Sequence, residues 1–104
     1  MATIKERIDF MTGLHLTEMD IMARKAHDYS GDQDCNKNIR ACEMVGICTA
    51  EQGIMIRLFD KFQRLTNLIN GETAKVKESR LDTIMDARNY LGILAHVMKE
   101  KGLV

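Results

Sequence analysis

The sequence predicts an all-α protein, and three observations lead to this fold class. Apolar residues recur at spacings of three and four in several segments, as they do on one face of a helix. No segment alternates with period two strongly enough to indicate a strand. Pairs of helix-capping residues precede these segments in a chain without proline. The expected architecture is a small helical bundle with two long helices and two or three shorter ones.

The first third of the chain is predicted to contain two helices. Thr3 and Glu6 form a capping box, in which each side chain can satisfy a free backbone amide of the other residue, so a short helix is expected to start there. Gly13 is expected to interrupt it, and Thr17 to begin a second helix through "EMDIMARKAHDY". Gly31 is the predicted terminator of that second helix.

The middle of the chain carries the clearest helical pattern. Asn36 is expected to cap a short helix through "IRACEMV", which Gly46 ends. Thr49 and Gln52 form a second capping box and predict a long helix over about residues 50–69. The predicted apolar face of this helix comprises Ile54, Leu58, Phe62, Leu65 and Ile69.

The last helix is predicted to follow a stop at Asn70 and Gly71. Ser79 is its expected cap, and the helix then runs through "RLDTIMDARNYLGILAHVMKEK" to Gly102. A chain of 104 residues can bury one hydrophobic core and not two. Residues 1–104 are therefore expected to form a single all-α domain.

Composition narrows the classes of function and location. The 15 basic residues balance 15 acidic ones, which removes the general attraction that binders of duplex DNA or RNA depend on. No apolar run approaches the roughly 20 residues of a bilayer span, so no membrane association is expected. Three cysteines and no secretory signal favour the reducing cytoplasm, without disulfides. The cysteine spacings do not fit a zinc site, and Cys42 and Cys48 are interpreted as small core residues.

Two polar stripes are candidates for a functional site. The stripe on the long helix spans about 100° of its circumference and comprises Arg57, Asp60, Lys61 and Arg64. The stripe on the last helix comprises Asp82, Asp86 and Asn89, with Glu78 just before it and Tyr90 at its margin.

These stripes have two interpretations. They are solvated faces, or they meet as interhelical salt bridges worth at most about 1 kcal/mol each. Alternatively, the cations of the first stripe hold phosphate oxygens, for which guanidinium groups are suited. Asp60, Asp82 and Asp86 would then hold a divalent ion such as Mg²⁺, which prefers oxygen ligands.

The polar stretch "HDYSGDQDCNKN", residues 27–38, is predicted to form one wall of a site for a phosphate-bearing ligand. A rival hypothesis is an EF-hand calcium loop, although Lys37 stands where that loop needs glycine. Capping and turn formation are a third explanation for such residues. The candidate calcium ligands are Asp32, Asp34, Asn36, Asn38 and Glu43.

Four blocks of the chain resemble a known family. In order along the chain they are "KAHDYSGD", "NIRACEMVGI", "GIMIRLFDKFQRLTNL" and "ESRLDTIMDARNYLGIL". From Ile21 to Gly102 the chain resembles the phage-encoded nucleotide modification associated domain family, which is similar to the MazG-like all-α nucleoside triphosphate pyrophosphohydrolases. The resemblance implies a phage protein that acts in the cytoplasm of the infected cell, either on free nucleotides or on those bound for modified DNA.

The resemblance also implies functional residues. The implied ligand-binding set is Lys25, Asp28, Tyr29, Arg57, Lys61, Arg64, Asn89 and Tyr90. The set that could hold Mg²⁺ is Asp60, Glu78, Asp82 and Asp86. The chain departs from the MazG pattern, because the metal-binding pair of glutamates is not found upstream of Asp60 and Glu51 stands alone on the long helix.

Three functions follow as hypotheses. The first is a nucleotide-binding homo-oligomer that sequesters a linear or cyclic nucleotide, such as a signal made by host immunity, and so counters host defence. The second is a magnesium-dependent hydrolase that splits a nucleoside triphosphate between its α and β phosphates, with Glu78 as the candidate base. The third is a purely protein-binding phage factor. The missing glutamate pair favours binding over catalysis.

Overall fold

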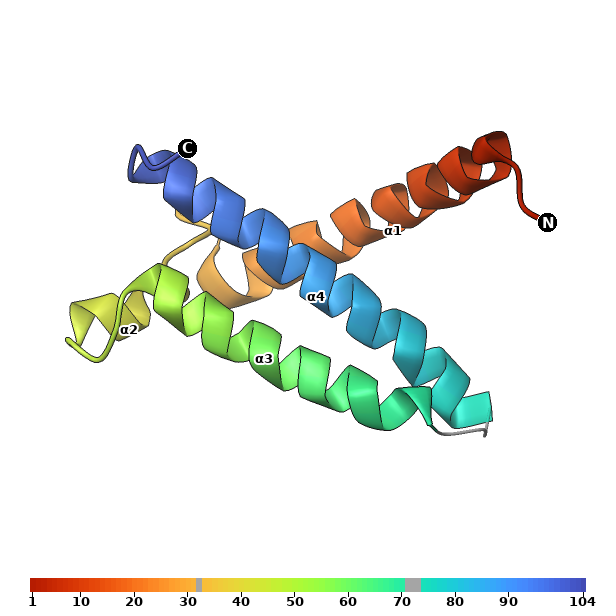
Figure 1. Cartoon of the computed structure of the whole chain (residues 1–104). Helices are drawn as coiled ribbons and strands as arrows, with labels where there is room; N and C mark the ends of the chain where they lie inside the picture. The colour runs from red at the N-terminus through yellow and green to blue at the C-terminus, as the bar shows by residue number, and fades with distance from the viewer. Residues whose placement is uncertain (32, 71–73) are drawn as a thin grey trace. The chain divides into compact units, whose positions relative to one another are not determined.

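The computed structural model describes residues 1–31, 33–70 and 74–104, and within these ranges the side chains at positions 29 and 74–78 are left undescribed. The described residues form helices and no strand, so the predicted all-α class is confirmed (Figure 1). No described helix combines the length and the apolar character that crossing a membrane requires. The helices are α1 (Ile4–Ser30), α2 (Ala41–Met44), α3 (Ala50–Ile69) and α4 (Ala74–Glu100).

The chain divides into two compact units, Met1–Cys35 and Asn36–Val104. The first unit contains α1, and the second contains α2, α3 and α4. In the second unit α3 and α4 run antiparallel, side by side (Figure 1). Their pairing positions the candidate site described below.

The helix α1 is continuous over 27 residues. It begins at the predicted capping box, where the Glu6 amide donates to Thr3 Oγ1 at 3.1 Å. The predicted break at Gly13 is wrong, because a glycine costs a helix only about 1 kcal/mol and a long helix absorbs that cost. Thr17 begins no new helix, since its hydroxyl donates back to the Gly13 carbonyl at 3.2 Å. Gly31, with φ of 75°, ends α1 as predicted.

The predicted capping role of Asn36 is wrong. The helix α2 begins after Arg40, whose side chain makes no capping hydrogen bond. The Asn36 side chain is buried, lies 3.1 Å from His96 Nδ1 and donates to the Glu100 carboxylate. It therefore connects the segment before α2 to the last turns of α4. Gly46, with φ of 76°, lies in the turn that follows α2, as predicted.

The bounds of α3 are confirmed, and it begins at the predicted capping box of Thr49 and Gln52. The predicted start of the last helix is wrong, because α4 begins at Ala74, five residues before Ser79. Ser79 instead lies within α4, where its carbonyl accepts a hydrogen bond from the Thr83 hydroxyl at 2.6 Å. The Arg80 guanidinium donates to the last two carbonyls of α3 at 2.8 and 2.9 Å, which satisfies acceptors that a helix end leaves open.

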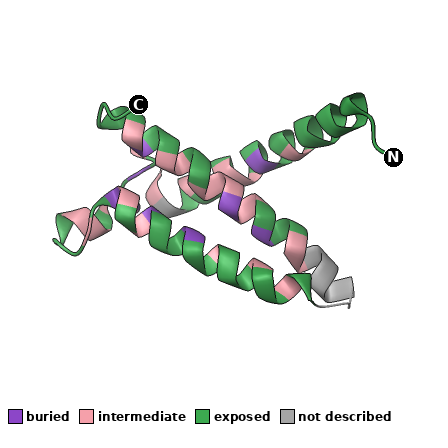
Figure 2. Cartoon of the chain, in the orientation of Figure 1, coloured by how far each residue is buried: buried purple, intermediate pink, exposed green. Residues whose placement is uncertain are grey.

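The core of the second unit lies between α3 and α4 (Figure 2). Ile54 and Leu58 are each 1% exposed, as their place on the predicted apolar face requires. Phe62 and Ile69 were assigned to the same face and are exposed, so the predicted face is only partly correct. Among the residues whose burial is described, the buried apolar ones are Ile39, Ala50, Ile54, Leu58, Ala87 and Val97.

An ionic cluster of Glu43, Glu51 and Lys101 joins α2, the first turn of α3 and the end of α4. Lys101 Nζ donates to Glu43 and lies 2.6 Å from Glu51 Oε1. Glu43 Oε1 also accepts a hydrogen bond from the Ala50 amide at 2.6 Å. The Ala50 amide and the Lys101 ammonium hold the pKa of Glu43 below its usual 4.5, and the two carboxylates raise the pKa of Lys101 above its usual 10.5.

This cluster predicts a specific pH dependence of stability. Because the folded pKa of Glu43 is lowered, its contribution to stability is present above pH 4.5 and is lost as the pH falls through the folded pKa. The substitution Glu43→Gln is therefore expected to lower the thermal unfolding midpoint at neutral pH, and the difference from wild type should shrink as the pH falls below 4.5. Thermal unfolding across the acid range measures this, and a difference that stays constant there would contradict the assignment.

Candidate functional site

The two polar stripes predicted from the sequence meet along one side of α3 and α4. Lys61 Nζ on α3 lies 3.3 Å from Asp86 Oδ2 on α4, and both side chains are about one third exposed, at 28% and 33%. This pair places the centre of the first stripe against the centre of the second. It matches the salt-bridge interpretation, and its own contribution to stability is at most about 1 kcal/mol because water screens it.

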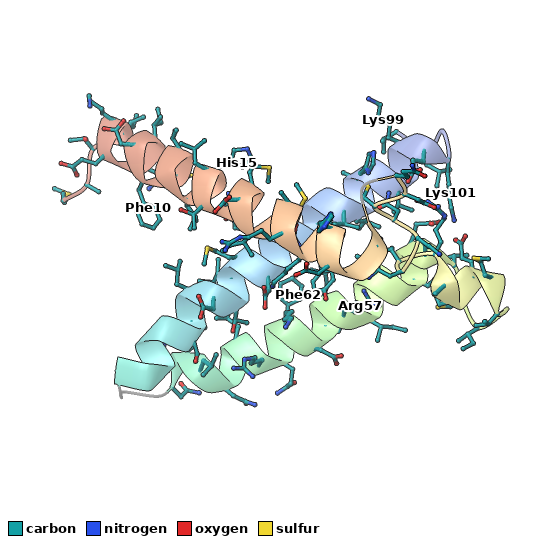
Figure 3. All side chains as sticks on the ribbon, turned by 180° about the vertical axis from the view of Figure 1, so that it is seen from behind. Phe10, His15, Arg57, Phe62, Lys99 and Lys101 are labelled. Carbon is teal, nitrogen blue, oxygen red and sulfur yellow. The ribbon has the colours of Figure 1, made fainter. Side chains whose placement is uncertain are left out.

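One turn of α3 before this pair, Arg57 lies over an aromatic ring. Its guanidinium carbon is 5.8 Å from the centroid of the Tyr90 ring on α4, within the range of a cation–π interaction. Tyr90 is half-buried and packs against the core, which fixes its ring. Arg57 is exposed on α3 (Figure 3). The ring therefore orients the guanidinium and leaves it accessible to solvent.

On the other side of the pair, Arg64 contacts a hydroxyl. Its Nε donates to Thr83 Oγ1 at 3.3 Å, and Thr83 in turn donates to the Ser79 carbonyl. Thr83 is 3% exposed, so this hydroxyl is a fixed anchor for the arginine. An arginine has five N–H donors, and the contact to Thr83 uses one of them.

The three contacts share one register. On α3 the cations follow one another at spacings of four and three residues, and on α4 their partners step back by the same spacings. At a rise of 1.5 Å per residue, the cations therefore extend over about 10 Å of α3. We call this surface the cationic face; its residues are Arg57, Lys61 and Arg64 with their partners Tyr90, Asp86 and Thr83.

The cations of this face differ in their electrostatic surroundings. The positive charge of Lys61 is offset by the Asp86 carboxylate. Among the residues that the structure describes, the ion pairs do not include Arg57 or Arg64, whose contacts are with an aromatic ring and a hydroxyl. Neither guanidinium group thus forms a direct ion pair in the described part of the chain, although the exposed Asp60 lies in the same stripe of α3. Such groups suit bidentate recognition of a phosphate or a carboxylate.

The remaining predicted ligand-binding residues are distributed over both units. Asn89 is half-buried on α4. Lys25 and Asp28 lie on α1, in the first unit. The predicted role of Tyr29 concerns a side chain that lies outside the described residues.

The predicted carboxylates do not gather into a metal site within the described part of the chain. No group of three or more His, Cys, Asp or Glu side chains that could hold a metal ion occurs among the residues described. Asp60 and Asp82 are exposed, on α3 and α4 respectively. Asp86 pairs with Lys61, and the side chain of Glu78 lies outside the described residues.

The polar stretch before α2 has protein partners. Residues 27–30 belong to α1, so the predicted loop is shorter than the stretch "HDYSGDQDCNKN". Of the candidate calcium ligands, Asn36 binds His96 and Glu100, while Glu43 binds Ala50 and Lys101. Asp32 lies outside the described residues. For Asn36 and Glu43, these contacts favour a structural role over the EF-hand alternative.

Sequence reasoning missed Thr83 as a part of the cationic face. Its position could have been found from the helical spacing, because Thr83 precedes Asp86 by one turn and follows Ser79 by four residues within the last helix. Thr83 carries no charge and is buried, so a pattern of charged, exposed residues does not include it.

Comparison with protein-family models, curated proteins and solved structures found no match to this chain.

Proposed function

We propose that the cationic face binds the phosphate groups of a nucleotide. The observation that carries this proposal is the placement of Arg57 and Arg64 on the same side of α3, each held by an uncharged partner. Each guanidinium keeps several N–H donors for phosphate oxygens, and charge-assisted hydrogen bonds of this kind are the strong ones. Lys61, between them, adds a third cation whose charge Asp86 already offsets.

Tyr90 supplies the second element of nucleotide recognition. Its ring lies against Arg57 at the edge of the core, and a purine or pyrimidine can stack on an aromatic ring or on a guanidinium plane. A base next to Tyr90 would place its attached phosphates along α3, toward Lys61 and Arg64. The proposed ligand is therefore a linear or cyclic nucleotide.

The proposed role is sequestration without turnover. It is supported by Asp86, which compensates Lys61, and by the missing glutamate pair of the MazG pattern. Together with the resemblance of the sequence, this suggests a phage-encoded protein that removes a nucleotide, such as an immune signal of the host, from the infected cytoplasm.

The proposal includes assembly into a homo-oligomer. Along α1, Ile4, Ile8 and Met11 are exposed at 78%, 56% and 45%, and they follow one another at spacings of four and three residues. This spacing is typical of helices that pack against another helix. A second copy of the chain is the proposed occupant of this stripe, and light scattering coupled to size exclusion measures the assembly.

The alternative proposal is a magnesium-dependent pyrophosphohydrolase. Its support is the position of Asp82 and Asp86, four residues apart on α4, where Asp86 belongs to the cationic face. Carboxylates at this spacing project to one side of a helix, as metal sites in helical bundles require. Asp60 and Glu78 are the further proposed ligands, and Glu78 is the candidate base.

One experiment separates the two proposals. The purified protein is incubated with a panel of linear and cyclic nucleotides and Mg²⁺, and the solution is chromatographed before and after heat denaturation of the protein. A nucleotide that leaves the free pool and returns intact on denaturation supports sequestration. Release as monophosphate and pyrophosphate supports the hydrolase, and a panel in which every nucleotide stays free throughout contradicts both proposals.

A further inference from the structure

Two cysteines face each other across the turn between α2 and α3. The Cys48 amide donates to the Cys42 carbonyl at 3.4 Å, and the neighbouring Ile47 amide donates to the same carbonyl at 3.0 Å. The backbones at these positions are therefore adjacent, although five residues separate them in the sequence. Both thiols are free and half-buried.

The two sulfur atoms converge on Gly53 of α3. A Cβ atom added at Gly53 would lie 3.1 Å from Cys42 Sγ and 3.7 Å from Cys48 Sγ, so the missing side chain provides the space that the sulfurs occupy. The neighbouring Cys42 thiol and burial raise the pKa of Cys48. Cys42 Sγ further lies 3.5 Å from the Thr49 carbonyl. The backbone hydrogen bond and the positions of the two sulfur atoms thus both place Cys42 beside Cys48.

We propose that Cys42 and Cys48 are an oxidation site, a dithiol that closes to an intrachain disulfide by exchange with a small disulfide such as oxidised glutathione. A disulfide needs Cα atoms about 4.4–6.8 Å apart, and the backbone hydrogen bond between Cys48 and Cys42 brings their backbones close together. The bond would link the end of α2 to the turn that starts α3. The sequence alone suggested no such pairing, because both cysteines read as core residues.

The chemistry is a two-step exchange. One protein thiolate attacks a sulfur of oxidised glutathione, and a mixed disulfide and one glutathione thiolate result. The second protein thiolate then attacks the protein sulfur of the mixed disulfide, and the other glutathione leaves. Two protein thiols are oxidised to a disulfide while one glutathione disulfide is reduced to two glutathiones. Because the pKa of Cys48 is raised, the reaction is expected to be slow at neutral pH and faster in mild alkali.

The test uses the full chain with Cys35→Ser, which removes the exposed third thiol. The protein is incubated with oxidised glutathione at about pH 8, near the ordinary pKa of a thiol, then quenched in acid, alkylated and weighed by intact mass spectrometry. The expected product carries neither alkyl groups nor glutathione and is about 2 Da lighter than the reduced protein, having lost two hydrogen atoms. The matched control adds Cys48→Ser and should instead accumulate one glutathione on Cys42.

A second measurement asks whether the folded structure favours the bond. The unfolding midpoint of the oxidised protein is expected to exceed that of the reduced protein and to return when a reductant is added. Two separate glutathione adducts, chain-to-chain disulfides, or thiols that stay reduced while the unfolded chain oxidises would overturn the proposal. A lower midpoint after oxidation would overturn it as well. None of these outcomes depends on whether the chain binds a nucleotide.

Discussion

Replacing Leu58 with alanine is expected to lower the free energy of unfolding by about 2–5 kcal/mol, the range for removing a fully buried leucine side chain. Leu58 is 1% exposed and belongs to a small core, in which the part of the chain that the structure describes has six buried apolar residues. A core this small has few neighbours that can close the cavity left by the substitution. Urea denaturation followed by circular dichroism measures the loss.

The matched control for this prediction lies on the same helix. Ile56 is 58% exposed on α3, so Ile56→Ala is expected to change the free energy of unfolding by less than about 0.5 kcal/mol. The two variants remove similar numbers of carbon atoms from the same element. Equal losses in both would mean that Leu58 is not buried in solution as the core requires.

Replacing Arg57 and Arg64 together with alanine is expected to weaken nucleotide binding by about 100-fold or more. Each guanidinium lies on the cationic face, held by Tyr90 or Thr83. A hydrogen bond to a charged group contributes about 1.5–3 kcal/mol, so the loss of two such contacts corresponds to a factor of about 10² to 10⁴. Isothermal titration with the nucleotide retained in the chromatographic experiment measures the affinity.

Two controls separate specific contacts from general charge. Lys99→Ala removes a cation from the last turn of α4, away from the cationic face, and should leave the affinity nearly unchanged (Figure 3). Arg57→Lys keeps the charge and loses the planar fork, so an intermediate affinity is expected. If the double alanine variant bound every retained nucleotide as tightly as wild type, the cationic face would not be the binding surface.

The parts of the fold that follow from local signals were predictable from the sequence. Both capping boxes form as expected, because each needs only residues three positions apart. The ends of α1 and α3 were likewise predictable from Gly31 and Asn70, which act on the turn that they terminate. Gly13 was given too much weight, since one glycine in a long helix costs less than the neighbouring turns contribute.

The parts that depend on distant residues could not be predicted in the same way. Asn36 has the composition of a cap, and its side chain instead binds His96 and Glu100, 60 and 64 residues further along. No pattern in the neighbouring sequence indicates whether an asparagine caps a helix or binds distant side chains. The exposure of Phe62 and Ile69 has a similar origin, because the width of the buried face depends on how α4 crosses α3.

In the candidate site too, the local pattern was predictable and the contacts between helices were not. Helical periodicity correctly collected Arg57, Lys61 and Arg64 on one face of α3. Their partners on α4 depend on the register between the two helices, which the sequence does not state. The structure supplies it through the Lys61 contact with Asp86 and the Arg64 contact with Thr83.

The contacts between residues 36–43 and the end of α4 have a consequence for the order of folding. Asn36 and Glu43 meet partners about 60 residues away, whereas Arg64 meets Thr83 only 19 residues away. Closing a loop three times longer costs about 1 kcal/mol more in chain entropy. The pairing of α3 with α4 is therefore expected to form first, and residues 36–43 to join it late. The same segment, which includes Cys42, is then expected to be the first part of the second unit to open when the native state fluctuates.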